Sequence, residues 1–155
     1  MDSTSFQQKD GKRVMRHKPG QYLTFALELP RKGTDQARND SISSGPEDRS
    51  YRINVKHEAK PGVPPGIVSN WLHDHAGPGT VLKVAPPAGE FFLNEKEENP
   101  VVLLSGGVGL TPMVSMLKHV ARILRAMVGG LARTGVALNR ILYEFSGPAD
   151  ELLAA

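Results

Sequence analysis

The fold of the second part of the chain is decided by the stretch Val101-Val102-Leu103-Leu104-Ser105-Gly106-Gly107-Val108-Gly109-Leu110-Thr111-Pro112-Met113. An apolar run stops at a glycine-rich turn, and a helical pattern follows at once. Bare glycine backbone lets a ligand approach closely, and the start of a helix presents free N–H groups to an anion. Such a turn either packs a helix tightly or holds a nucleotide pyrophosphate, and its place between strand and helix favours the nucleotide.

Apolar residues behind this turn recur every three or four positions from Met113 to Leu131. This spacing is typical of an amphipathic helix, and because it keeps its phase throughout we predict one continuous helix. Gly135 suits the end of that helix, and residues 141–145 resemble a strand. Strand, helix and strand together predict a βαβ unit that follows an acid-rich boundary at residues 94–99.

Residues 1–98 instead show the two-residue alternation of antiparallel strands. Residues 22–29 place Leu23, Phe25, Leu27 and Leu29 on one face, and residues 51–56 direct Tyr51, Ile53 and Val55 inward. Residues 80–85 form a third predicted strand, residues 66–73 a short helix, and residues 30–50 a polar loop. We therefore predict a small antiparallel β-barrel.

The composition narrows the class of protein. The chain has 155 residues, 39% of them hydrophobic, and a net charge of +3 from scattered Lys and Arg, which does not indicate nucleic-acid binding. It has no cysteine, which excludes disulfides and thiolate metal sites. Because the sequence contains neither a membrane-length apolar run nor a signal-peptide pattern, we expect a cytoplasmic protein without a membrane partner.

Three short motifs in the first part each allow two interpretations. The turn Pro19-Gly20-Gln21-Tyr22 is either a simple β-turn or a place where Tyr22 meets a cofactor. Residues 38–43 are either a solvated loop or a phosphate site in which Arg38 binds bidentately. Ser69 either caps the short helix and nothing more, or marks an anion site at its first turn.

Other reactive side chains do not form convincing sites. The spacing of His57, His73 and His75 does not bring three metal ligands together, so we expect structural or solvated histidines and no metal. Ser105 and Ser115 lack a nearby histidine with an orienting acid, which argues against hydrolytic chemistry.

Taken in order, seven segments resemble the reductase half of the flavohemoglobins, a branch of the ferredoxin-reductase-like flavin enzymes. The resemblance implies that a barrel binds FAD and that an α/β domain binds NAD(P)H. It also implies that electrons pass to the haem of a globin, which converts nitric oxide and dioxygen to nitrate. The segments are Pro19–Tyr22, Arg38–Ser43, Tyr51–Lys56, Gly66–His73, Pro87–Phe92, Ser105–Met113 and Tyr143–Pro148.

The resemblance also implies residue roles. The residues expected to contact FAD are Tyr22, Arg38, Asn39, Asp40 and Ser41, and those expected beside its pyrophosphate are Gly66, Val68 and Ser69. Those at the nicotinamide nucleotide are Gly107, Val108, Gly109, Leu110, Thr111 and Pro112. Those against the flavin ring are Phe145, Ser146, Gly147 and Pro148, and Glu144 is the catalytic candidate that influences its redox behaviour.

The chain departs from the family pattern in four respects. Asp40 stands where the family has a flavin-stacking Tyr, and Ser146 where a Phe covers the ring. The middle of the nicotinamide domain is missing, and haem belongs to a globin that this chain lacks. The shortened sheet is therefore expected to expose apolar surface on Leu103 and on the helix.

These observations predict an FAD-binding barrel of residues 1–98 with an incomplete first strand, followed by an incomplete parallel α/β nicotinamide-binding domain of residues 99–155. The predicted function is the FAD-dependent NAD(P)H oxidoreductase portion of a flavohemoglobin, with a globin or another electron acceptor as partner. A non-catalytic FAD-binding module and an inactive truncated product are the alternatives.

Overall fold

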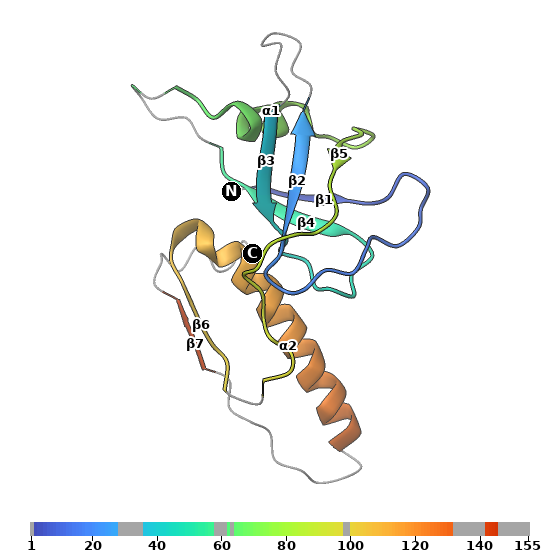
Figure 1. The fold of residues 1–155 in the computed structure, drawn as a ribbon, viewed down its shortest axis with the longest axis vertical. Helices are drawn as coiled ribbons and strands as arrows, with labels where there is room; N and C mark the ends of the chain where they lie inside the picture. Colours follow the sequence, from blue (N-terminus) through green and yellow to red (C-terminus); the bar gives the residue numbers. More distant parts are fainter. Residues whose placement is uncertain are drawn as a thin grey trace.

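The computed structural model describes residues 2–27, 36–57, 62, 64–97, 100–131 and 142–145. Strands dominate the first part of the chain, and a long helix dominates the second (Figure 1). The elements of the first part are β1 (Asp2–Phe6), β2 (Tyr22–Leu27), β3 (Gln36–Ser41), β4 (Tyr51–Val55), α1 (Ile67–His75) and β5 (Lys83–Val84). Those of the second part are β6 (Val102–Ser105), the 3-10 turn η1 (Gly107–Gly109), α2 (Leu110–Leu131) and β7 (Leu142–Phe145).

The strands of the first part form an open antiparallel sheet system. β1 pairs with β4, and β2 lies between β3 and β5. The two groups meet where Ile42 bridges Ile53 and where the Ser43 N–H donates to the Arg52 carbonyl at 2.7 Å. The order is therefore β1, β4, β3, β2, β5. The predicted barrel is not closed, because among the described strands β1 pairs with β4 alone and β5 with β2 alone.

The predicted core of the first part is confirmed. Leu23, Phe25 and Leu27 are buried on one face of β2, as their alternation requires, and Ile53 is fully buried on β4. Two residues of α1, Val68 and Leu72, complete this apolar cluster. Tyr51 is only half-buried, because its hydroxyl reaches out to donate to the Met15 carbonyl at 2.6 Å. Leu29 lies outside the described residues.

Several predicted boundaries in the first part are wrong. Residues 36–41, expected to be loop, form the polar strand β3, and residues 80–85 pair as a strand only at Lys83–Val84. Thr80 instead closes a turn, since its hydroxyl donates to the His75 carbonyl at 3.0 Å. The N-terminal cap of α1 is Gly66, which has no side chain to bond with, so Ser69 does not cap the helix.

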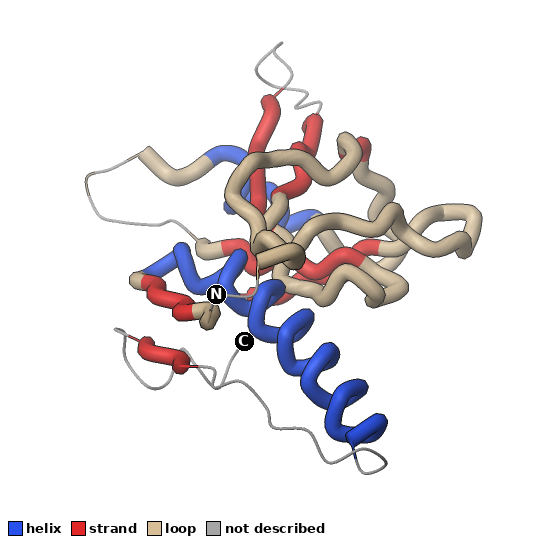
Figure 2. The backbone as a smooth tube through the Cα atoms, turned by 60° about the horizontal axis from the view of Figure 1, so that its bottom comes forward, coloured by secondary structure: helices blue, strands red, loops and turns tan. Residues whose placement is uncertain are grey.

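The second part is the predicted βαβ unit. β6 and β7 are parallel, and α2 is one continuous helix, as its unbroken apolar stripe indicates. The first half of α2 lies under the strand-rich part, and its second half extends away from it (Figures 1 and 2). The end predicted at Gly135 lies outside the described residues. Within the described chain, no helix has the length and apolar character needed to cross a membrane.

The exposed apolar surface of β6 differs from the prediction. Leu103 is buried on the side of the strand that meets the helix, with 6% of its surface exposed. The alternation of the strand then turns Val102 and Leu104 to the opposite face, where they are 55% and 62% exposed. The uncovered face of the shortened sheet is therefore the one that carries Val102 and Leu104.

Candidate functional site

The glycine-rich turn leaves open space around its backbone. Gly107 has a φ of +56°, a conformation that favours glycine, and the Gly109 N–H donates to the Gly106 carbonyl at 3.2 Å. No described atom lies within 4 Å of a side chain built at Gly107 or at Gly109. A turn used only for tight helix packing would crowd these positions. The geometry therefore favours an approach by a ligand from outside.

This turn lies at the carboxyl edge of the small parallel sheet. In the register of the two strands, Leu104 faces Glu144 and Ser105 faces Phe145. Because the carboxyl ends of parallel strands meet at one edge, two predicted groups are brought together: the nucleotide turn and the residues expected near the flavin. Val108 at the turn is 66% exposed. Ser146, Gly147 and Pro148 lie outside the described residues.

The first turn of α2 is packed into the protein. Leu110 is 2% exposed and Thr111 is 5% exposed, and Pro112 is also buried. Their side chains therefore anchor the helix start. The accessible surface at this edge is formed by the glycines and Val108.

The segments predicted to hold FAD lie on both faces of the β2–β3 pair. Tyr22 and Ser41 face each other on the side turned away from the core, next to Asn39, which accepts a hydrogen bond from the Thr24 hydroxyl at 2.8 Å. The Tyr22 ring packs on Gly89, where an added Cβ would come within 2.7 Å of the ring. Gly89 also has a φ of +109°, so both its backbone and its neighbour require glycine.

Arg38 and Asp40 share the other face of β3, opposite Phe25 and Leu23. The Arg38 Nε lies 3.7 Å from the Asp40 Oδ1, and the Arg38 side chain keeps 45% of its surface exposed. The Asp40 Oδ2 is buried and has no hydrogen-bond partner among the described residues. Burial raises the pKa of Asp40, and the neighbouring Arg38 offsets part of that rise.

The start of α1 holds a second buried polar atom that has no hydrogen-bond partner in the part of the chain that the structure describes. The Ser69 hydroxyl lies in the first turn of the helix, where backbone N–H groups have no partner within the helix, and the residue is only 1% exposed. Val68 beside it belongs to the core. A phosphate oxygen accepts from such a hydroxyl and from such N–H groups, and the half-exposed guanidinium of Arg38 on β3 is a further group that could bind a phosphate. These residues fit the pyrophosphate of a dinucleotide.

A buried polar cluster joins α2 to the strand-rich part. The His17 Nε2 lies 3.2 Å from the Ser44 carbonyl oxygen and 3.3 Å from the Ser115 hydroxyl, which itself donates to Ser44 at 2.8 Å. Burial lowers the pKa of His17. Ser115 thus has a histidine beside it that the sequence did not reveal, and the Nε2 of that ring meets the Ser44 carbonyl. Ser115 is fully buried and its proton is held by a carbonyl, so the pair anchors a helix and does not form a nucleophile.

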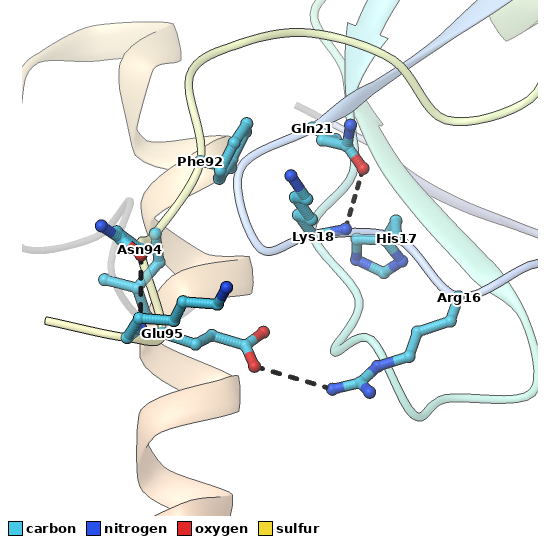
Figure 3. Close-up of a pocket in the computed structure, with 9 residues that line it drawn as sticks. Arg16, His17, Lys18, Gln21, Phe92, Asn94 and Glu95 are labelled. Carbon is cyan, nitrogen blue, oxygen red and sulfur yellow. Dashed lines mark hydrogen bonds and ion pairs between the residues drawn. The ribbon is translucent and has the colours of Figure 1, made fainter.

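A second group of contacts lies one turn further along α2. His119 lies between the carboxylates of Glu47 and Glu95, at 3.7 Å and 3.3 Å, and Arg16 contacts both acids. Figure 3 shows Arg16 reaching toward Glu95 across a cavity of about 460 Å³. No motif marked this junction in the sequence. The only available signal was a set of polar residues within the helical stripe of α2.

Gly20 allows the helix to come this close. Its φ is +108°, and a Cβ there would lie 2.5 Å from Met116 Cε and 2.6 Å from the Phe91 carbonyl oxygen. The Pro19–Tyr22 segment is thus a turn, and it also serves as the contact point between the two parts of the chain.

The remaining histidines have structural contacts. His73 Nε2 lies 3.0 Å from the Val55 carbonyl oxygen, and the His57 ring packs edge-on against it. The His75 ring stacks on Trp71. In the part of the chain that the structure describes, no group of three potential ligands could hold a metal ion.

The fold is found in solved structures of a reductase and of an FAD/NAD binding domain. The chain aligns over 97% of its length with phthalate dioxygenase reductase, with a TM-score of 0.66 and 27% identity, and covers 42% of that chain. It aligns over 96% of its length with the flavohem-like FAD/NAD binding domain of nitric oxide dioxygenase from Vibrio cholerae, with a TM-score of 0.72 and 28% identity, and covers 74% of that chain. The class of fold is therefore ferredoxin-reductase-like, as predicted.

Comparison with curated proteins shows which members of this fold class the chain is similar to in sequence. The chain is 49% identical over 116 residues to a flavohemoprotein of Halalkalibacterium halodurans and 40% identical over 122 residues to flavohemoprotein B of Dictyostelium discoideum. These alignments cover 73% and 74% of this chain but only 28% and 29% of the relatives. No protein-family model matches the chain. The chain is thus related to the flavohemoproteins and resembles their FAD/NAD-binding portion.

Proposed function

We propose that this chain is the FAD-dependent NAD(P)H oxidoreductase portion of a flavohemoglobin. Residues 1–98 bind FAD and residues 99–155 receive the nicotinamide nucleotide. A globin haem or another acceptor takes the electrons, and the protein works in the cytoplasm. The observation that most supports this proposal is that the open glycine turn, Glu144 and Phe145 lie at the same carboxyl edge of the parallel sheet. The chain that carries them is related to flavohemoproteins.

In this proposal different residues bind the FAD pyrophosphate, the flavin and the nicotinamide nucleotide. Arg38, Ser69 and the first N–H groups of α1 hold the FAD pyrophosphate, and Tyr22 supports the flavin from the solvent side of β2. Gly107 and Gly109 admit the nucleotide, because their backbone is open. A bound FAD would supply the chemistry of accepting a hydride from the nicotinamide and releasing electrons one at a time. Glu144 supplies a negative charge near the flavin that tunes its potential.

The experiment is reduction of the FAD-loaded chain by NADH without air. We expect the flavin absorbance to bleach, and we expect Gly109→Ala to slow the bleaching by about tenfold to a hundredfold, because a methyl group enters the space where the nucleotide lies. The variant should load FAD normally, since that Cβ meets no protein atom. Loaded protein that NADH does not bleach would contradict the oxidoreductase proposal.

A non-catalytic FAD-binding module is the second candidate, and two observations favour it. Asp40 places a buried carboxylate where the flavin-stacking Tyr is expected, and one face of β6 is uncovered at Val102 and Leu104. If the assignment of position 40 is correct, Asp40→Tyr should tighten FAD binding by about tenfold, through an added aromatic contact and the loss of a charge. Unchanged FAD affinity in a titration would count against that assignment.

A further inference from the structure

One face of β3 carries a base and an acid beside the apolar core. β3 runs next to β2 (Figure 1), and in their register Arg38 lies opposite Phe25 and Asp40 lies opposite Leu23. Phe25 and Leu23 are fully buried, so this face of the sheet turns toward the core. The Asp40 side chain is 10% exposed and that of Arg38 is 45% exposed. The carboxyl therefore lies inside the protein, and the guanidinium lies at its surface.

The two side chains form an ion pair within the strand. The Arg38 Nε lies 3.7 Å from the Asp40 Oδ1, and the Asp40 Oδ2 is buried with no hydrogen-bond partner among the described residues. A buried carboxylate without donors is unfavourable in its charged form, and burial accordingly raises the pKa of Asp40. The neighbouring Arg38 offsets part of that rise. The charged form of Asp40 thus depends on Arg38.

Charged groups on the elements around β3 have other contacts or lie elsewhere. β2 has no charged residue between Tyr22 and Leu27, and the Arg52 guanidinium on β4 donates to the Ser3 hydroxyl. Within the described chain, Arg38 is the charged group whose field reaches the Asp40 carboxyl. The titratable residues of α1, which contributes to the same core, are all in its last turn: His73, Asp74 and His75.

The charged form of Asp40 opposes the binding of a diphosphate to Arg38 in two ways. It holds the guanidinium, whose N–H groups bind phosphate oxygens, and it repels the negative charge of the ligand. Protonation of the carboxyl removes both effects, because the neutral acid carries no charge and its O–H becomes a donor. Binding at Arg38 should therefore strengthen as the pH falls through the folded pKa of Asp40, which burial places above its ordinary value.

We propose that Asp40 is a positioning residue that holds Arg38 in an internal ion pair, so that a diphosphate ligand must compete with the Asp40 carboxylate for the guanidinium. The ligand class is a nucleotide with an esterified diphosphate, and it binds most tightly when the carboxyl is protonated. The choice of FAD as that ligand rests on the proposed function. The competition for Arg38 applies to any ligand of this class.

The first test follows FAD affinity of the full chain by flavin fluorescence from pH 8 to pH 4.5. At pH 8, Asp40→Asn should bind FAD about tenfold more tightly than the parent chain, and the difference should narrow as the pH falls. Asp10→Asn removes an exposed acid that pairs with Lys12 at 3.0 Å, and as the matched control it should keep the affinity and pH profile of the parent. Equal affinities of parent and Asp40→Asn at pH 8, or a difference that does not change with pH, would overturn the proposal.

The second test asks whether Asp40 acts through Arg38. In an Arg38→Gln background, Asp40→Asn should gain less than about threefold in FAD affinity at pH 8, because there is no guanidinium to release. A full tenfold gain in that background would assign the effect to direct repulsion of the ligand and overturn the positioning role.

ADP-ribose separates this inference from the proposed function, because its diphosphate is esterified at both ends, as in FAD, but it carries no flavin. If the chain binds no FAD while ADP-ribose shows the expected dependence on Asp40 and on pH in calorimetry, the proposed function is wrong and the inference stands. Equal binding of ADP-ribose to the parent chain and to Asp40→Asn at pH 8 overturns the inference. If neither FAD nor ADP-ribose at about 10 mM binds, both are wrong.

Discussion

Residues 2–97 and residues 100–145 bury their apolar side chains in different ways. The strand-rich part has its own core, in which Leu23, Phe25, Ile42 and Ile53 are fully buried. The βαβ part buries Leu103, Leu110 and Met116 but leaves Val102 and Leu104 exposed. Much of its burial comes from docking α2 on the strand-rich part. The comparison shows that the first part stabilises itself, while the second depends on the junction at His17, Gly20 and Ser115.

The largest expected effect tests the core of the strand-rich part. Phe25→Ala removes a fully buried ring and should lower the free energy of unfolding by about 3–5 kcal/mol. Leu104→Ala, on the uncovered face of β6, should change it by less than about 0.5 kcal/mol. Urea denaturation of both variants measures the difference. If Phe25→Ala and Leu104→Ala lowered the free energy of unfolding equally, the two parts of the chain would share one core.

The next effect tests the junction. Gly20→Ala places a methyl group against Met116 and the Phe91 carbonyl at a positive φ, and should cost about 1–3 kcal/mol. The matched control is Gly77→Ala, where no atom lies within 4 Å and φ is not positive. It should leave stability unchanged or slightly raised. Hydrogen exchange should show lost protection in α2 for the first variant only, and protection that persists would contradict the docking described.

Acidification tests the same junction through one titratable group. Because burial lowers the pKa of His17, its contribution to stability is fully present above the unfolded value of 6.5 and decreases as the pH falls through the lower folded value. His17→Gln should cost about 1 kcal/mol at pH 8 and lessen the loss of stability below pH 6.5. Unfolding free energies from pH 8 to pH 5, with exposed His57→Gln as control, measure this. An unchanged pH dependence in His17→Gln would argue against a buried neutral His17.

The smallest effect concerns Asp40 inside the strand-rich part. Its pKa is raised, so its contribution to stability is present below the unfolded value of 3.8 and is lost as the pH rises through the folded value. Asp40→Asn should therefore be more stable than the parent chain at pH 7, by about 1 kcal/mol, and the advantage should vanish near pH 4. Thermal denaturation at both pH values measures this, and a variant less stable at pH 7 would contradict it.

Local periodicity predicted the elements whose burial is one-sided. The alternation of Leu23, Phe25 and Leu27 identified β2, and the helical stripe from Met113 identified an unbroken α2. β1 and β3 were missed because Asp2–Phe6 and Gln36–Ser41 are mostly polar, and their strand character comes from pairing with distant partners.

The candidate site was predictable only where a motif is local. The glycine turn is visible in sequence because backbone freedom requires particular residues at adjacent positions. The contact of His17 with Ser115 joins residues that are far apart in sequence, and the open margins at β1 and β5 depend on the whole strand order. Neither leaves a periodic signal.

The most direct test of the account is the flavin content of the purified chain after incubation with FAD and gel filtration. The proposed role of Arg38, Ser69 and the start of α1 predicts one FAD for each chain, and about tenfold weaker retention in Arg38→Gln, because the charge that pairs with the pyrophosphate is lost. A colourless chain that takes up no FAD, while showing the cooperative unfolding expected of its core, would contradict the central claim that residues 1–98 form a flavin site.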